Sequence, residues 1–267
     1  MGKTRIDAHS LLKKIREQKP VVHHLTNWVT IYDCANIVKV LGASPVMAHA
    51  KEEAAEMANI ASSLVLNIGT LTPEFVEAMK IAAKSANKKG IPVVLDVCGA
   101  GATKLRDEKS FELLNEVKID ILKGNASEIA RISGENIRTK GVDSAEVDAD
   151  MLNVSRWLAE RFKAVVVVTG AHDIITGKGK SYIVKNGHSL MTHVVGTGCM
   201  AASAIGTFAA IEKDLAFASA CALVCFGISA ELAAKKSRGP ASFKEKMFDA
   251  IFNLDKKTIN RMQKASQ

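Results

Sequence analysis

A glycine-rich segment near the start of the last third of the chain, VVGTGC, carries a cysteine where helical residues begin. Residues 194–206 continue with small side chains typical of a buried helix. Successive backbone N–H groups that run into a helix N-terminus bind anions, and the helix dipole adds about half a positive charge there. The same field lowers the pKa of a thiol, so Cys199 is a candidate base or nucleophile beside the loop glycine Gly198. GTGC alone is not specific, and a helix-start turn with a buried cysteine is the alternative.

Two further segments carry oxygen-bearing side chains directly after predicted strands. In LKGNASE, Asn125 and Glu128 lie three residues apart at a helix start, and we expect both to face one cleft. Their oxygens suit Mg²⁺, which prefers oxygen ligands and keeps much of its water. A helix cap plus a solvated acid is the alternative. Asp96 ends the strand VVLDV before a glycine-rich turn, where a lone aspartate often only caps the turn.

Competing motifs fit the chain less well. GAGAT follows a strand but lacks the third glycine of the dinucleotide fingerprint, and Asp120 precedes the apolar stretch that a ribose-binding acid should follow. The phosphate-binding pattern GxxxxGK[ST] is absent from the sequence. His23 and His24 are adjacent in a predicted strand, so they point to opposite faces and are expected to be structural rather than to share a metal.

The elements that would position these residues alternate between strands and helices. From residue 21 to residue 169, apolar runs rich in β-branched residues alternate with segments of helical periodicity. This pattern predicts parallel βαβ units and a three-layer αβα fold, with a mostly parallel central sheet flanked by helices. Residues 171–187 predict short antiparallel strands at glycine turns, and the chain from residue 198 onward predicts helices. No linker or repeat is visible, so residues 1–267 are expected to form one domain.

The chemistry-bearing residues follow the predicted strands. In open parallel sheets, ligands bind outside the carboxyl ends of the strands. The segments at that edge are LNIGTL, LDVCGAGAT, LKGNASE, VVTG and, before the final helices, VVGTGC. Five such loops on one edge predict a cleft.

Composition excludes several classes of protein. The chain has 267 residues, of which 48% are hydrophobic and 24% charged, with a net charge of +8 and only 5% aromatic residues. Lysines spread along the chain and few stacking platforms argue against nucleic-acid binding, while a positive field suits an anionic small molecule. We expect no charge-free apolar run near the ~18 residues of a spanning helix, hence no membrane association. Five cysteines without a CxxC pair, and no export signal, indicate the cytoplasm; Cys221 and Cys225 read as core residues.

With these residues assembled, the chain resembles the ribokinase-like superfamily and, within it, the hydroxyethylthiazole kinase family. The resemblance covers nearly the whole length. GTGC and NASE stand where the superfamily carries its anion loop and its Asn-x-x-Glu motif, and cysteine in place of the superfamily's aspartate is similar to the thiazole kinases. The most specific stretch is HHLTNWVTIYDCANIVKVLGASPVMAHAKEEAAEMA, through Asn27, Ala35, Asn36, residues 42–45 and Met47.

The resemblance implies roles for individual residues. Met47, Gly196 and Asn27 match positions that bind the thiazole alcohol. The nucleotide positions fall on Lys123, where some relatives carry arginine, and on Thr169; lysine offers phosphate a point charge rather than a planar fork. Asp96 and Glu128 match positions near magnesium and the phosphates.

The implied activity is transfer of the γ-phosphoryl group of ATP, with Mg²⁺, to the primary hydroxyl of 4-methyl-5-(2-hydroxyethyl)thiazole in thiamine salvage. The resemblance also implies a homotrimer with active sites between subunits, and we expect a small apolar thiazole pocket near Val29, Met47 and Cys199. Alternatives are a kinase for another small alcohol such as hydroxymethylpyrimidine, a non-catalytic nucleotide or metabolite sensor, or a cysteine-dependent acyl transferase, for which only His193 is near in sequence.

Overall fold

The computed structural model describes residues 6–134 and 144–267. Within this part of the chain one nine-stranded sheet has the order β2-β1-β3-β4-β5-β6-β7-β8-β9. The strands are β1 (Val21–Leu25), β2 (Ser44–Val46), β3 (Ser63–Asn67), β4 (Val93–Asp96), β5 (Ile121–Asn125), β6 (Val165–Thr169), β7 (Asp173–Gly177), β8 (Lys180–Val184) and β9 (Ala265–Ser266).

The sheet is parallel from β2 to β6 and antiparallel from β6 to β9. The parallel strands are near-continuous apolar runs, buried along most of their length, because helices cover both of their faces. Residues 178 and 179 form the two-residue turn between β7 and β8. The predicted mostly parallel sheet and its antiparallel extension are therefore confirmed.

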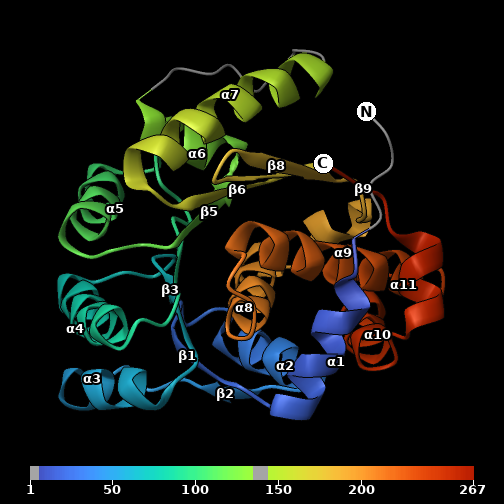
Figure 1. Ribbon diagram of the computed structural model, residues 1–267, viewed down its shortest axis with the longest axis horizontal. Helices are drawn as coiled ribbons and strands as arrows, with labels where there is room; N and C mark the ends of the chain where they lie inside the picture. Colours follow the sequence, from blue (N-terminus) through green and yellow to red (C-terminus); the bar gives the residue numbers. More distant parts are fainter. Residues whose placement is uncertain (1–5, 135–143) are drawn as a thin grey trace.

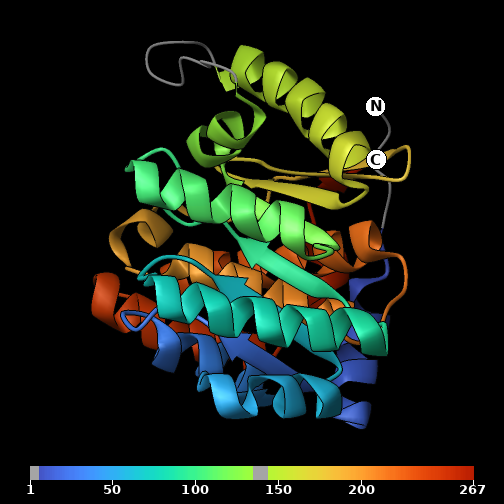
Figure 2. The same cartoon turned by 90° about the vertical axis from the view of Figure 1, so that its left-hand side faces the viewer.

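Helices form the two outer layers (Figure 1). One face carries the helices of the middle of the chain, which Figure 2 shows from in front: α3 (Lys51–Ile60), α4 (Pro73–Lys89), α5 (Lys104–Glu116), α6 (Ala126–Ser133) and α7 (Ser144–Phe162). The other face carries α1 (Ala8–Gln18), α2 (Ile31–Leu41), α8 (Thr197–Ala209), α9 (Leu215–Ala234), α10 (Pro240–Phe252) and α11 (Lys256–Met262), with the 3₁₀ helix η1 (Ser189–His193). Two apolar cores fill the spaces between the three layers.

Local sequence explains where the helices begin and end. Pro73 occupies the first turn of α4, where its missing N–H costs nothing, and Gly90 ends that helix in the left-handed conformation. Both boundaries agree with the sequence. The scattered charges of the first residues form the polar side of α1, which the sequence did not predict, and the short β2, β9 and the alanine-rich α3 were missed as well.

The helix α9 corrects the expectation that no segment is apolar enough to span a membrane. Among the described residues, Leu215–Ala234 is the one helix with the length and composition to do so. Residues 215–230 of this helix carry no charge, which the sequence analysis overlooked. Most of its side chains, including Cys221 and Cys225, are buried against neighbouring helices and the sheet. This packing explains its composition as that of a core helix.

The first helix, α1, lies beside the end of α10 (Figure 1). The Arg16 guanidinium on α1 donates to the carbonyls of Ile251, Phe252 and Leu254 at 2.8–3.0 Å. These bonds give the carbonyls at and just after the C-terminus of α10 a side-chain donor.

Candidate active site

The glycine-rich segment forms a close turn onto the N-terminus of α8. Gly196 precedes the helix with φ +89°, and a Cβ there would lie 2.4 Å from Thr30 Cγ2. Only glycine fits both this left-handed backbone and this close approach. A Cβ on Gly198 would lie 3.2 Å from Lys123 Nζ, so the lysine ammonium lies against the first turn of α8. The predicted anion loop is thus a helix N-terminus with a cation beside it.

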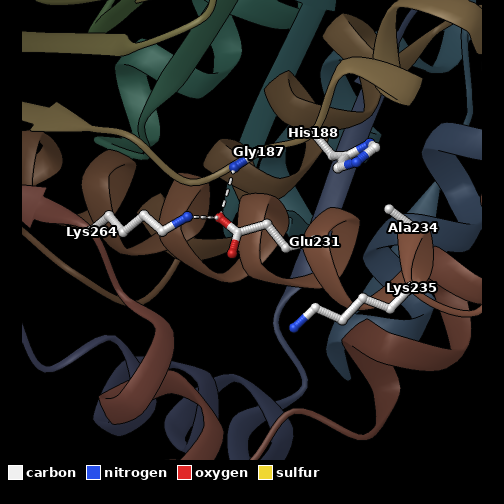
Figure 3. A pocket seen from close by; sticks show the side chains of 6 residues that line it. All are labelled: Gly187, His188, Glu231, Ala234, Lys235 and Lys264. Carbon is white, nitrogen blue, oxygen red and sulfur yellow. Dashed lines mark hydrogen bonds and ion pairs between the residues drawn. The ribbon is translucent and has the colours of Figure 1, made fainter.

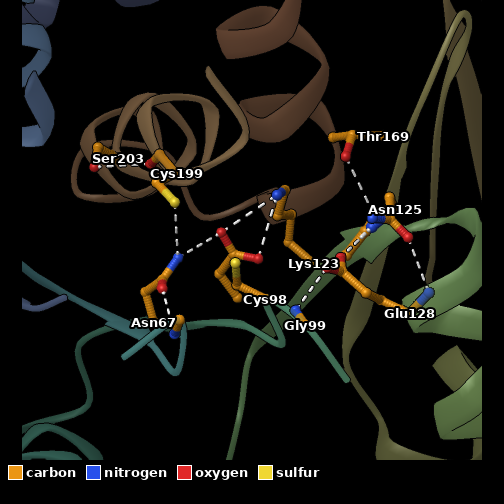
Figure 4. A network of polar contacts seen from close by, with 12 residues as sticks. Asn67, Cys98, Gly99, Lys123, Asn125, Glu128, Thr169, Cys199 and Ser203 are labelled. Atoms are coloured by element: carbon orange, nitrogen blue, oxygen red, sulfur yellow. Dashed lines mark hydrogen bonds and ion pairs between the residues drawn. The ribbon is translucent and has the colours of Figure 1, made fainter. Parts of the chain in front are cut away.

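Cys199 occupies that first turn, and its sulfur accepts hydrogen bonds from two asparagines, of which Figure 4 shows Asn67. Asn27 Nδ2 is 3.1 Å and Asn67 Nδ2 3.3 Å from Cys199 Sγ. Asn67 Nδ2 also donates to Asp96 Oδ2 at 2.8 Å, and Asn27 Nδ2 donates to Asn67 Oδ1 at 2.9 Å. Asn27, Asp96 and Cys199 are distant in sequence, yet one hydrogen-bonded chain joins them.

The surroundings of Cys199 favour the thiolate. A hydrogen bond from the Cys98 thiol lowers the pKa of Cys199 to about 5 against the effect of burial, with help from Thr30, Lys123 and Asn27. The Cys98 thiol holds its proton, since this contact, burial and the neighbouring carboxylates raise its own pKa. Cys199 is therefore charged at neutral pH, as the helix N-terminus predicts.

Asp96 and Lys123 form a buried ion pair beside the thiolate. Lys123 Nζ lies 3.2 and 3.3 Å from the two oxygens of Asp96, whose exposed fraction is 1%. Burial raises the pKa of Asp96 to about 7, although Lys123 opposes the shift. Burial also lowers the pKa of Lys123, but Asp96, Glu128 and Cys199 raise it by more, so the ammonium keeps its charge. Asp96 is thus not merely a cap for the turn after β4.

Glu128 ties two loops together at the start of α6. Its Oε1 accepts from Gly99 N and its Oε2 from Asn125 N, both at 2.7 Å, while Asn125 Oδ1 accepts from Glu128 N at 2.9 Å. Asn125 and Glu128 therefore form a capping box. The cap alternative is confirmed, whereas a solvated acid is wrong, because Glu128 is buried.

No group of three or more His, Cys, Asp and Glu side chains among the described residues is arranged to hold a metal ion. Both oxygens of Asp96 and of Glu128 already have protein partners. The carboxylates of Asp96 and Glu128 interact electrostatically, as expected for two acids that face the same region of the structure.

Thr169 ends β6 at the edge of the sheet that carries Asp96 and Lys123. Its hydroxyl donates to Gly124 O at 3.3 Å, which leaves an oxygen lone pair and a half-exposed side chain. Asp173 begins the neighbouring strand and accepts from Gly170 N at 3.2 Å. Burial raises the pKa of Asp173 to about 7. Nothing in the sequence distinguished this aspartate from a turn residue.

The β1–α2 loop brings apolar side chains to the same edge. Val29 and Tyr32 are 68% and 76% exposed, and Trp28 is 49% exposed although it stacks on Phe75. Met47 follows the edge strand β2, whose last residue pairs with β1, and it is half-buried. Val29 is thus on the surface of the single chain rather than in a closed pocket.

The two adjacent histidines have separate structural roles, as expected. His23 Nε2 lies 2.7 Å from Ala48 O, and His24 Nε2 lies 3.1 Å from Ser203 Oγ on α8. They point to different faces of the sheet.

Sequence reasoning missed several side chains that organise the site. Asn67 and Cys98 lie in two loops that were noted for their position only. Arg106 joins these loops, since its guanidinium donates to Ile68 O, Cys98 O and Gly69 O at 2.7–2.9 Å. Asn67 and Cys98 carried a signal, because they end or directly follow strands at the active edge; Arg106 lies inside a polar helix and carried none.

A cavity of about 460 Å³ lies beyond the end of β8 (Figure 3). Glu231 Oε1 in its wall accepts from Lys264 Nζ at 3.0 Å and from Gly187 N at 3.2 Å. β8 is parallel to β6, so the cavity belongs to the same edge of the sheet as Thr169. Adjacent strands are about 4.8 Å apart, which separates the ends of β6 and β8 by roughly 10 Å.

Comparison with known proteins agrees with this geometry. The model of the hydroxyethylthiazole kinase family matches residues 12–257. The hydroxyethylthiazole kinase of Methanosarcina mazei is 54% identical over 256 residues, covering 96% of this chain and 98% of the relative. That of Methanocella arvoryzae is 49% identical, covering 93% and 95%.

Solved structures give the same result. The hydroxyethylthiazole kinase of Pyrococcus horikoshii superposes with a TM-score of 0.89 at 39% identity, covering 97% of this chain and 98% of the other. A ribokinase-like superfamily protein of Enterococcus faecalis shares the fold alone, with a TM-score of 0.65 at 14% identity over 94% and 98% of the chains. The ribokinase-like fold and the match along nearly the whole chain assign this protein to the hydroxyethylthiazole kinase family.

Proposed function

We propose that this protein transfers the γ-phosphoryl group of ATP to the primary hydroxyl of 4-methyl-5-(2-hydroxyethyl)thiazole, the salvage step that supplies the thiazole half of thiamine. The observation that carries the proposal is the contact of Lys123 with Gly198, beside a Cys199 thiolate. A cation, a helix N-terminus and a base meet there at one point. Phosphoryl transfer needs those three groups together.

The backbone N–H groups from Gly196 to Cys199 bind the migrating phosphoryl group in this proposal. The transition state is loose, with its charge on the equatorial oxygens, so positioned donors and a cation contribute most of the stabilisation. Lys123 supplies the cation, held in place by Asp96. The hydroxyl of Thr169 lies farther along the edge and contacts the nucleotide.

Cys199 accepts the proton of the substrate hydroxyl late in the reaction. A thiol with a pKa of about 5 is a weaker base than most general bases. A loose transition state tolerates this, because little proton transfer is needed before the phosphoryl group has largely left ATP. Asn27, which donates to Cys199 Sγ, also lies where it can orient the hydroxyl.

Asp96 and Glu128 are the residues that would hold Mg²⁺ together with the phosphates. Magnesium usually enters with substrate phosphates, keeps several waters and needs only one or two carboxylates, so two acids that already have protein partners still fit it. The ion supplies neutralisation of phosphate charge when bound. Glu128 also keeps Gly99 and Asn125 in place, whether or not the ion is present.

The cavity beyond β8 is proposed to take the nucleoside end of ATP. The cavity lies roughly 10 Å from the end of β6 along this edge of the sheet. This distance suits the length of a triphosphate whose terminal phosphate lies at Gly198. The cavity combines the exposed ring of His188 with the polar wall at Glu231.

The acceptor side is proposed to be completed by a second subunit. Val29, Tyr32 and Trp28 expose apolar surface directly beside Asn27, and Met47 follows the neighbouring edge strand. An exposed apolar cluster of this kind is typical of a protein interface. We therefore propose a homotrimer with the thiazole bound between subunits, against Met47 and Gly196.

We further propose that residues 1–267 form one domain and that the protein acts in the cytoplasm on small molecules, without nucleic acid or membrane. The single sheet through the described chain and five free cysteines support this.

The test is a substrate panel. Purified protein is incubated with ATP, Mg²⁺ and either the thiazole alcohol or hydroxymethylpyrimidine, and the phosphorylated product is measured by mass. We expect the thiazole phosphate with a kcat/KM at least about 100-fold above that for the pyrimidine. Preferred turnover of the pyrimidine, or tight binding of both substrates without turnover, would refute the proposal.

A further inference from the structure

A second cavity opens at the opposite edge of the sheet from Cys199. Its volume is about 560 Å³, within the usual range for small-molecule sites. Val165 at the beginning of β6 and the β7–β8 turn form its floor, while the end of α7 and the beginning of α9 form two walls. It therefore lies between both helical layers, far from the residues of the proposed kinase reaction.

The charges around this cavity do not balance. Six cationic and three anionic side chains line it: Lys118, Arg156, Lys163, Lys178, Lys180, Lys213, Asp120, Glu160 and Asp214. Two of the acids are engaged, because Asp120 pairs with Lys118 at 2.5 Å and also accepts from Val93 N, and Asp214 pairs with Lys180 at 3.2 Å and caps α9. The lining keeps a net charge of +3.

Four of these cations form no ion pair within the described parts of the chain: Arg156, Lys163, Lys178 and Lys213. Glu160 is the one lining carboxylate left to balance them. Several like charges around one hollow repel one another, and a multivalent anion would relieve that repulsion.

Two of the free lysines occupy backbone positions that disfavour them. Lys163 follows α7 with φ +51°, and Lys178 takes the first turn position of the β7–β8 hairpin with φ +49°. Glycine or asparagine is the usual residue in both places, because a side chain strains the left-handed conformation. The sequence thus carries positive charge at the cavity where an uncharged residue would be more stable.

The rest of the lining is apolar and small. Ala159, Ala164, Val165, Leu215 and Ala216 offer apolar surface on which an uncharged ring can pack. An adjoining cavity of about 530 Å³ shares Lys118, Asp120, Lys213 and Leu215 with this one, which gives an elongated ligand additional room.

We propose that this cavity binds a phosphate ester of a small ring compound, with the phosphate groups among Arg156, Lys163, Lys178 and Lys213 and the ring on the alanine-rich wall. The guanidinium of Arg156 offers the planar fork that matches phosphate, and the three lysines add point charges. A phosphate monoester or a diphosphate, each of which carries more than one negative charge, balances the charge of +3 better than a single carboxylate does.

Binding is tested by calorimetry with inorganic pyrophosphate and with adenosine monophosphate, in the absence of Mg²⁺. The test variant combines Lys163→Asn, Lys178→Asn and Lys213→Ala, in which asparagine suits the left-handed positions and keeps the fold. The matched control is Lys19→Asn, which removes one charge at another left-handed lysine, φ +48°, outside the cavity. A second control, Gly198→Val, obstructs the catalytic loop and leaves the cavity intact.

We expect saturable binding by the unmodified protein, Lys19→Asn and Gly198→Val, with affinity reduced at least tenfold in the triple variant. Retained affinity in the triple variant, or loss in Gly198→Val, would overturn the proposal, because the anion would then bind elsewhere or at the kinase site. An oligonucleotide that binds much more tightly than both small anions would overturn it as well. Kinase activity enters none of these results, so they stand apart from the test of the proposed reaction.

Discussion

The phosphate half and the acceptor half of the proposed active site are built differently. Around Lys123, Asp96 and Cys199 the polar side chains are buried and hydrogen-bonded to one another. Around Val29 and Tyr32 the side chains are apolar and exposed. One chain therefore supplies the buried polar side chains of the proposed phosphate half, whereas it leaves the apolar side chains of the proposed acceptor half uncovered. Substitutions in the two halves should differ both in size and in their dependence on assembly.

Gly198→Val should have the largest effect. The added side chain meets Lys123 Nζ, 3.2 Å from the first new carbon, and fills the space of the migrating phosphoryl group. We expect kcat to fall by more than about 100-fold, because misplacement by about 1 Å costs that much. Steady-state kinetics measure this. Gly239→Val, at an extended glycine with open space around it, is the control and should retain full activity.

Lys123→Met should reduce kcat/KM by about 100-fold, since one charge-assisted donor to the transition state is lost. Asp96 then loses the cation that opposes its burial, so its pKa rises further above 7 and it becomes protonated at neutral pH. The neutral acid keeps the fold intact. Lys123→Arg should recover most of the activity, and failure of both variants at unchanged melting temperature would indicate that the amine geometry, rather than its charge, is required.

Val29→Asp tests the acceptor half. A charge on this exposed apolar residue should dissociate the oligomer and lower kcat/KM for the alcohol by about tenfold, through lost contacts at an interface centre. Sedimentation and kinetics are measured at the same protein concentration. Ile60→Asp, at the exposed last residue of α3, should change neither. An active monomer would show that the acceptor half needs no partner.

Cys199→Asp should preserve turnover within about tenfold, because a late base contributes little to a loose transition state. Asparagine donors that now bind the sulfur would bind the carboxylate instead. Turnover is measured under single-turnover conditions. An inactive aspartate variant with an unchanged circular dichroism spectrum would contradict a late base and favour a more direct role for sulfur.

Cys98→Ala should have the smallest effect at alkaline pH, where Cys199 is still a thiolate, and a clear effect at lower pH. The Cys199 thiolate loses the hydrogen bond that contributes most to its low pKa, so this pKa rises from about 5 toward the ordinary thiol value. The loss of activity on acidification, which begins near pH 6 in the unmodified enzyme, should then begin at a higher pH, because the Cys199 thiol is already protonated there. Absorbance of the thiolate measures the pKa directly. Cys221→Ala, inside α9, should leave the titration unchanged.

Much of the fold follows from the sequence because the periodicities are strong. The parallel strands are runs of buried β-branched residues, and glycines or prolines mark many helix ends. The helix α1 was missed because its amphipathic pattern was examined only as a possible export signal, and β2 because three residues carry no period. The charge-free stretch of α9 was overlooked because most residues of this helix are buried. Its sequence is therefore apolar throughout and shows no hydrophobic periodicity.

The positions of the candidate site residues in the fold were predictable from the sequence, but the hydrogen bonds between them were not. Cys199, Asp96 and Lys123 lie where strand ends and a helix start indicated them. The bonds through Asn67 and the three carbonyls held by Arg106 depend on side-chain conformation, which no local pattern encodes. The exposure of Val29 likewise depends on where the β1–α2 loop lies in the folded structure, which no local sequence pattern encodes.

The bonds from Arg16 to the end of α10 have a consequence for synthesis. The sequence separation between Arg16 and Leu254 is 238 residues, so the first helix emerges from the ribosome long before its partner exists. Contacts of such separation form late and slow the folding of a chain. The apolar side of α1 must therefore remain uncovered during most of translation, and a nascent chain stalled before residue 250 should be a substrate for chaperones.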